Sequence, residues 1–184
     1  YSISANASGN DYYFANSATS KLTIGDMVYT VISAKDVVMY YKNGTRLEGT
    51  LKDLNGNVIS GADVKITING VTYTRTTDKD GKFAMNINLV AGEYPVYIKF
   101  DSNDKQWGSD AKVNVLIKST IASRDVTKMF RNGTQFYAVF YDGHGNLLKN
   151  TDVKFNINGV WYIRKTNDLG TARLNIQLGP GKYI

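Results

Sequence analysis

Few residues of this chain have the type and spacing that chemistry would need. The sequence contains a single histidine, His144, and no cysteine, so it has no thiol nucleophile, thiolate metal site or disulfide framework. His144 lies in the stretch Asp142–Asn146 (DGHGN), whose glycines are typical of an exposed turn. With no second imidazole and no Ser/His/Asp set, we expect no catalytic residue and no enzyme activity.

Two short acidic segments are candidates for a metal site. Asp78 and Asp80 share one turn, and residues 101–104 (DSND) form another. Ca²⁺ prefers about six to eight oxygen ligands drawn from several segments. In addition, Leu169 takes the place of Asp80 in the second half of the chain. We therefore expect structural turns here, and we predict neither a metal ion nor another cofactor.

A Lys–Asn isopeptide crosslink is a third chemical possibility. It would need an apolar pocket in which the lysine loses its charge and a nearby acid stays protonated. Lys35 and Asn114 are the candidates if the first strand is joined to the last, but Arg124 replaces Lys35 in the second half and could not react. The sequence does not favour this crosslink.

Three sequons of the form Asn-x-Ser/Thr begin at Asn6, Asn43 and Asn132. One interpretation is N-glycosylation at all three positions. We expect Asn43 and Asn132 to lie on exposed loops at equivalent places in their domains. The other interpretation is that Asn-Gly-Thr is a favourable turn sequence. Both interpretations remain open at this point.

The chain repeats itself over most of its length. Residues 36–95 align without a gap on residues 125–184 at an offset of 89, with 24 of 60 positions identical. A period of about 20–50 residues would indicate a solenoid. A period near 90, as here, is typical of an independent β-sandwich domain of about 100 residues.

The N-terminal residues join the same pattern at an offset of 93. The matching positions are Tyr1, Asn10, Asp11 and Phe14, which fall on Tyr94, Asn103, Asp104 and Trp107. We therefore predict that residues 1–24 are the last strands of one repeat, residues 25–118 a complete repeat, and residues 119–184 the early strands of a following, incomplete repeat.

Apolar residues alternate with polar ones nearly everywhere, which indicates strands. Asn69-Gly70 and Asn158-Gly159 each lie between two alternating runs, the pattern of a two-residue hairpin turn. We predict strands at 27–34, 36–41, 45–53, 63–68, 71–77, 82–89, 94–101 and 110–118. The expected fold is all-β, with tandem immunoglobulin-like β-sandwich domains. The expected core residues are Val64, Ile66, Ile68, Met85, Ile87 and Leu89, with Val153, Phe155, Ile157, Leu174, Ile176 and Leu178 as their counterparts.

Several motifs resemble known surface-protein repeats. The segments 51–64 and 77–81 are similar to bacterial Ig-like or prealbumin-like modules. The segments 125–138, 155–162 and 172–183 resemble the repeat of adhesin-like surface proteins of methanogenic archaea. The resemblance implies a long, secreted, wall-anchored protein built of stacked Ig-like domains, and it implies no particular ligand.

Charge and hydropathy narrow the possible partners. The net charge is +6, but lysine and arginine form no run, so we expect no nucleic acid binding. No apolar segment approaches the roughly 18–20 residues of a membrane span. A mildly basic surface could attract cell-wall or host-cell polysaccharide, although a simply solvated surface is the alternative.

These observations favour a non-enzymatic, extracellular adhesin or stalk at the cell surface. Its partners would be neighbouring repeats or identical chains in a head-to-tail array. The alternative is a carbohydrate- or protein-binding module with Trp161 as an exposed aromatic platform, and a third reading is an accessory domain of a wall-degrading enzyme. The incomplete repeat should be completed by further chain or by the 1–24 hairpin of a neighbouring molecule, and a chain closing on itself would contradict this expectation.

Overall fold

Strands account for all of the regular secondary structure in the described part of the chain. The computed structural model describes residues 2–12, 14, 16–21 and 26–183, and within them it contains fifteen strands and no helix. The described residues therefore include no helix that could cross a membrane. The all-β prediction is confirmed.

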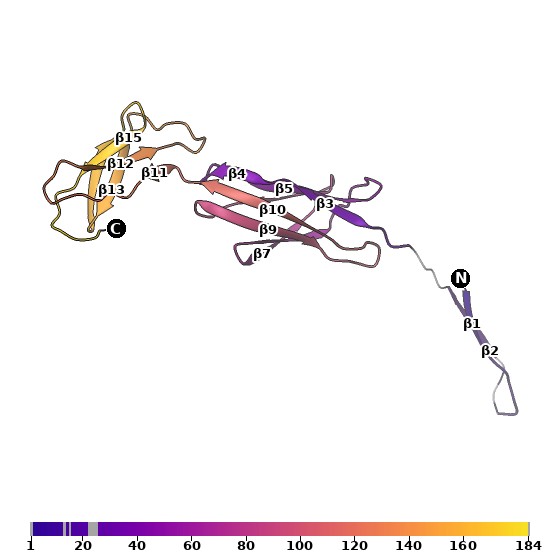
Figure 1. Cartoon of the computed structure of the whole chain (residues 1–184). Coiled ribbons are helices and arrows are strands. Elements are labelled where there is room, and N and C mark those ends of the chain that lie inside the picture. The colour runs from indigo at the N-terminus through magenta and orange to yellow at the C-terminus, as the bar shows by residue number, and fades with distance from the viewer. Residues whose placement is uncertain (1, 13, 15, 22–25, 184) are drawn as a thin grey trace.

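Eight strands form a first sandwich of two facing sheets (Figure 1). One sheet has the order β4-β10-β9-β6-β7, with β10 parallel to β4 and the other pairs antiparallel. The other sheet has the order β3-β5-β8. The strands are β3 Thr30–Ala34, β4 Val37–Tyr40, β5 Arg46–Asp53, β6 Asp63–Ile68, β7 Val71–Thr76, β8 Lys82–Asn86, β9 Gly92–Phe100 and β10 Ser109–Lys118.

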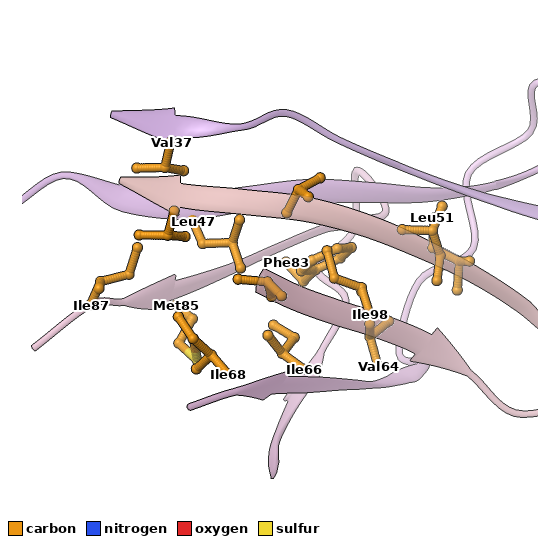
Figure 2. Packing of buried hydrophobic residues seen from close by; sticks show 14 of the residues in the cluster. Val37, Leu47, Leu51, Val64, Ile66, Ile68, Phe83, Met85, Ile87 and Ile98 are labelled. Atoms are coloured by element: carbon orange, nitrogen blue, oxygen red, sulfur yellow. The ribbon is translucent and has the colours of Figure 1, made fainter. Parts of the chain in front are cut away.

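The core lies between these two sheets because alternate residues of each strand point inward. Figure 2 shows Leu47 and Leu51 of β5 among the apolar side chains that surround Ile66 and Ile98. Five of the six expected core residues of this sandwich are buried, whereas Leu89 is half-buried at its margin. The buried five are Val64, Ile66, Ile68, Met85 and Ile87.

Both predicted Asn-Gly hairpins are present. Asn69 and Gly70 have φ of 49° and 75°, and Asn158 and Gly159 have φ of 51° and 77°. Positive φ at both central residues is what a type I′ turn requires, and asparagine and glycine adopt it most readily. The turns set the pairing of Ile68 with Val71 and the equivalent pairing in the second unit.

Five strands form a second, smaller unit. β11, β12 and β15 make a three-stranded sheet, and β13 and β14 make a hairpin. By the repeat, β12, β13, β14 and β15 correspond to β5, β6, β7 and β8. The strands are β11 Ile121–Ser123, β12 Gln135–Phe140, β13 Asp152–Ile157, β14 Val160–Lys165 and β15 Thr171–Asn175.

Within the described residues, the second unit has no counterpart of β4, β9 or β10. In the first sandwich β4 pairs only with β10. Residues 126–129, which match β4 in sequence, form no strand in the second unit. A short segment without a paired neighbour has no ladder of hydrogen bonds to hold it extended, which accounts for the irregular backbone of these residues.

The core of the second unit is correspondingly open on one side. Val153, Phe155 and Leu174 are buried as predicted, but the expected core residues Ile157 and Ile176 are half-buried, as is Leu178. In the first sandwich β9 and β10 contribute buried residues to the core beside Ile68 and Ile87, and the described residues of the second unit contain no equivalent strands. The sequence pattern identified the correct face but not this exposure.

A separate hairpin lies at the other end of the chain. It consists of β1 (Ser2–Ala7) and β2 (Asn16–Lys21), and all twelve of its strand residues are exposed. Figure 1 shows this hairpin and the second unit at opposite ends of the first sandwich. The assignment of residues 1–24 to the end of a preceding repeat stays a prediction, as do the segments 25–118 and 119–184. Residues 1, 13, 15 and 22–24 lie outside the described residues, as do residues 25 and 184.

Candidate functional site

The residues singled out for chemistry do not gather at one place. His144 is exposed on a turn, where its backbone N–H donates to Asp142 Oδ1 at 2.8 Å. Asn146 donates to the same carboxylate from its side chain and backbone, and these hydrogen bonds lower the pKa of Asp142. No cluster of three or more metal-ligating side chains occurs in the part of the chain that the structure describes.

The carboxylates of Asp78 and Asp101, in the two acidic turns, interact with other groups of the protein. Asp78 Oδ1 accepts backbone N–H groups of Asp80 and Lys82, each at 2.9 Å, and the pKa of Asp78 is lowered chiefly by the bond from Lys82. Asp101 lies 2.7 Å from the ammonium groups of both Lys65 and Lys99. These cations lower the pKa of Asp101 to about 2. Asp78 therefore organises its turn, and Asp101 joins β6 to β9.

Stability should depend on the ionisation of Asp101 at acid pH. Its folded pKa of about 2 lies below the ordinary aspartate value of 3.8. A carboxyl whose pKa is lowered on folding contributes stability above its unfolded pKa and loses that contribution as pH falls through the folded value. We expect Asp101→Asn to be less stable than wild type at pH 6 and to show a smaller stability loss between pH 4 and 2.

Denaturant unfolding at several pH values checks this expectation. Asp104→Asn, in the same loop region, is the control and should follow the wild-type curve. Parallel curves for Asp101→Asn and wild type between pH 4 and 2 would contradict the assigned role.

The candidate isopeptide residues do not meet in a pocket. Lys35 and Asn114 are both exposed, and the backbone N–H of Asn114 donates to Asp36 Oδ1 at 2.7 Å. Both side chains lie in solvent, so the apolar pocket that the reaction needs is missing at this pair. The structure does not support a crosslink between this pair.

The sequons occupy three different environments. Asn132 is exposed, and its Oδ1 accepts the N–H of Thr134 at 3.1 Å. Asn43 makes the equivalent bond to Thr45 at 3.0 Å but is only half-exposed, because it faces the second unit. Asn6 is exposed on β1. The repeated Asn-Gly-Thr sequence thus forms the same side-chain-capped turn in both units.

Trp161 is an exposed aromatic residue on β14. Its side chain is 65% exposed, and Val160 and Ile163 of the same strand are exposed as well. Tyr162, on the opposite face, packs against the core with Arg164 over its ring. Trp161 and Ile163, two residues apart, therefore share the outer face of β14.

The first sandwich and the second unit meet at a packed junction. The ring of Tyr40, at the end of β4, lies directly against the backbone of Gly145, where a Cβ atom would come within 2.4 Å of the Tyr40 hydroxyl oxygen. Asn43 is similarly close to Gly143. The ammonium of Lys118 lies 5.6 Å from the centre of the Tyr40 ring. The segment around Tyr40 and Asn43, the tip of the first sandwich, thus packs against the glycine turn of the second unit.

A short and well-bonded connector joins the two units. Only Ser119 and Thr120 separate β10 from β11. Ser119 Oγ accepts the N–H of Ile121 and donates to its carbonyl, at 3.0 and 2.7 Å, and the Thr120 carbonyl accepts the N–H of Tyr141 at 2.8 Å. These bonds restrict the backbone at the point where a hinge would lie.

Each of the two units has a position equivalent to Tyr40 and a position equivalent to Gly145. Gly56 occupies the turn position of Gly145 with nearly the same φ, 88° against 86°, but has no atom within 4 Å of its Cβ direction. Met129 occupies the position of Tyr40 and is 77% exposed. Each unit therefore has a protruding tip at one end and a glycine turn at the other. Sequence reasoning found these glycines but assigned them only to turn formation.

A pair of buried threonines also escaped the sequence analysis. Thr77 Oγ1 donates to the Ile59 carbonyl at 2.7 Å and accepts the N–H of Ala62 at 3.0 Å. Thr166, at the same repeat position, accepts the N–H of Thr151 at 3.0 Å. Both are buried, so each hydroxyl satisfies backbone groups that would otherwise lack partners. The sequence feature that could have indicated them is that both repeats have threonine at this position.

Comparison with known proteins gives a partial family match. Residues 46–122 match the family described as carboxypeptidase regulatory-like domain, which is less than half of the chain. No curated protein matches the sequence.

Solved structures that match this chain include bacterial surface proteins and titin immunoglobulin domains. A bacterial ice-binding adhesin is 11% identical with a TM-score of 0.41, covering 96% of this chain and 62% of its own. Domains 1–6 of the surface layer protein SbsC are 14% identical with a TM-score of 0.36, covering 93% and 27%. A pair of titin immunoglobulin domains is 11% identical with a TM-score of 0.37, covering 79% and 93%. The chain thus spans less than two thirds of the adhesin and the surface layer protein.

Proposed function

We propose that this chain is a non-enzymatic segment of an extracellular stalk or adhesin, in which immunoglobulin-like units stack end to end. The packed junction between Tyr40 and Gly145 supports this proposal most directly. A contact between a tip and a different surface of the next unit is heterologous, and such contacts repeat into open rows rather than closed pairs. The function of each unit is then to extend and orient the row.

The resemblance of the repeat to adhesin-like surface proteins of methanogenic archaea supports a location at the cell surface. Within that setting Asn132, Asn6 and the half-exposed Asn43 are proposed glycosylation sites, with Asn132 the most accessible member of the repeated pair. Intact-mass measurement on protein from its native source tests this part of the proposal, and an unmodified mass would contradict it.

The stalk proposal predicts that the junction holds the two units in one orientation. Gly145→Ala should loosen it, because the added Cβ would meet the Tyr40 ring. Gly56→Ala is the matched control, since both substitutions place a side chain at similar positive φ but only the first encounters a neighbour. Small-angle X-ray scattering on dilute chain measures the distribution of overall dimensions.

We expect Gly145→Ala to broaden this distribution and Gly56→Ala to leave it as in wild type. Tyr40→Ala should broaden it as well, because it removes the same contact from the other side. If wild type already scatters as two freely hinged units, or if the two alanine variants are indistinguishable, the chain is not a rigid stalk segment.

A carbohydrate- or protein-binding module remains the second candidate function. The observation that favours it is the exposed pair of Trp161 and Ile163 on the outer face of β14. Cell-wall polysaccharide is the proposed ligand class, because exposed indole rings offer flat apolar surfaces and the chain is mildly basic. Tryptophan emission that does not change when such polysaccharide is added to a Trp107→Phe variant would exclude this role for Trp161.

A further inference from the structure

The longest edge strand of the first sandwich is β7. The edge strands of its two sheets are β3, β4, β7 and β8, and β7 has six residues where the others have four or five. Among the described residues β7 pairs with β6 alone, and Figure 1 shows it at the margin of the sandwich. Backbone groups along such an edge can pair with a strand of another chain, so an edge of this length needs protection.

The register shows which backbone groups of β7 face the open edge. The Thr77 N–H donates to the Ala62 carbonyl at 2.9 Å, one position beyond the last pair of the β6–β7 ladder. In an antiparallel pair, residues that bond to the partner strand alternate with residues that do not. Every second residue of β7 therefore directs its backbone groups away from β6, and these residues are Thr72, Thr74 and Thr76.

The equivalent edge of β14 is more apolar. The Thr166 N–H donates to the Thr151 carbonyl at 2.9 Å, so the alternation is the same as in β7. Trp161 and Ile163 take the places of Thr72 and Thr74, and they are 65% and 58% exposed. Aromatic and β-branched residues favour strand pairing. Because the edge of β7 is open in a complete sandwich, the open edge of β14 follows from the fold of the unit.

An arginine lies on the open edge of β7. Arg75 Nη1 donates to the Thr74 carbonyl at 2.7 Å, and this carbonyl is one of those directed away from β6. The guanidinium carbon of Arg75 lies 5.8 Å from the centre of the Tyr73 ring. A guanidinium over an aromatic face is attracted by the ring, which holds it beside the edge carbonyl.

The second unit repeats this arrangement on β14. Arg164 Nη1 donates to the Ile163 carbonyl at 2.7 Å, and the guanidinium carbon lies 5.6 Å from the centre of the Tyr162 ring. The tyrosine and the arginine are the same in both repeats, although the residue between them changes from threonine to isoleucine. The arrangement is therefore independent of the side chain whose carbonyl it covers.

We propose that these two edge arginines, Arg75 and Arg164, close β7 and β14 to strand addition by another chain. An added strand would need the covered carbonyl as a hydrogen-bond acceptor. It would also have to displace a charged donor from that carbonyl, and hydrogen bonds with a charged partner are stronger than neutral ones. The units are thus kept from pairing side by side. This inference goes beyond the stalk proposal, since it holds whether or not units stack end to end.

Sedimentation of the full chain over a range of concentrations tests the role of Arg164. We expect Arg164→Thr to associate at a concentration at least about tenfold lower than wild type, because the edge carbonyl becomes free while threonine favours a strand. Lys165→Thr is the matched control. It removes the same charge from the same strand, but Lys165 lies on the opposite face of β14. Unchanged association of Arg164→Thr, or equal effects of the two substitutions, would overturn the proposal.

A proline locates the contact that Arg164→Thr creates. Ile163→Pro removes the N–H that faces the open edge and leaves the bonds between β14 and β13 in place, as proline is tolerated on the solvent side of an edge strand. The double variant Ile163→Pro with Arg164→Thr should therefore sediment like wild type. Association that persists in the double variant would place the contact elsewhere on the molecule and contradict the proposal.

The first sandwich provides a second test that does not depend on the stability of the second unit. Arg75→Thr should also increase association, but less than Arg164→Thr, because its edge carries threonines where β14 carries Trp161 and Ile163. Thr76→Ala, on the opposite face of β7, is the control and should sediment like wild type. An Arg75→Thr variant that associates no more than wild type would remove the proposed role from β7.

These tests are separate from the test of the stalk proposal. Arg164→Thr retains Tyr40 and Gly145, so scattering from dilute Arg164→Thr still measures the junction. A rigid junction in a variant that does not associate would leave the stalk proposal in place and exclude edge protection by Arg164. Association of Arg164→Thr in a chain whose junction is freely hinged would have the reverse meaning.

Discussion

Phe83→Ala is expected to lower the free energy of unfolding of the first sandwich by about 3–5 kcal/mol. Phe83 is 3% exposed and lies in the centre of the core (Figure 2). Its ring lies against Gly49 on the neighbouring strand, where a Cβ atom would come within 2.3 Å of the ring. Truncation to alanine would leave a cavity that the two rigid sheets cannot close.

The other repeat supplies the control for this substitution. The cross-strand pair Gly49 and Phe83 corresponds to Ala138 and Ala172 in the second unit. Gly49→Ala alone should also destabilise, because its Cβ meets the Phe83 ring. In the double variant Gly49→Ala with Phe83→Ala that clash is absent. The double variant should therefore lose less free energy of unfolding than the two single variants lose together. Strict additivity would show that the two residues are not coupled.

Tryptophan emission during denaturant unfolding provides the measurement. The chain has two tryptophans, Trp107 in the first sandwich and Trp161 in the second unit. A Trp161→Phe background therefore reports on the first sandwich, and a Trp107→Phe background reports on the second unit. An emission midpoint for Phe83→Ala that matches its background would refute the proposed packing.

Ile87→Ala should cost about 2–5 kcal/mol in the first sandwich, and the matched Ile176→Ala less than half as much in the second unit. Ile87 is 5% exposed and belongs to the buried cluster, whereas Ile176 at the same repeat position is half-buried. The cost of truncation follows the apolar surface that folding removes from water. The difference between the two losses in free energy of unfolding reports how much more solvent-exposed the core of the second unit is.

Tryptophan emission again provides the measurement. The Trp161→Phe background follows unfolding of the first sandwich, and the Trp107→Phe background follows unfolding of the second unit. A loss below roughly 0.5 kcal/mol for Ile87→Ala would mean that this strand face is assigned wrongly, because a buried isoleucine cannot be truncated so cheaply. Equal losses for Ile87→Ala and Ile176→Ala would show that the second unit is closed in solution.

Local sequence determined the strands and turns of this protein. Alternation placed β6 at residues 63–68, as predicted, and Asn69-Gly70 set its turn, because type I′ geometry needs residues that tolerate positive φ. The inward faces of β6 and β8 followed from the same alternation. The repeat carried these predictions from one unit to the other, since equal local sequence gave equal local structure.

Exposure and contact between units were decided by tertiary structure. Ile157 and Ile68 share one repeat position and are both followed by Asn-Gly-Val, yet only Ile68 is buried, because β9 lies beside it. Gly145 and Gly56 likewise form the same turn, but only Gly145 contacts another unit. The sequence by itself determined which face of each strand is apolar. Only the tertiary structure decided whether that face is covered, because burial depends on strands that are distant along the chain or belong to another unit.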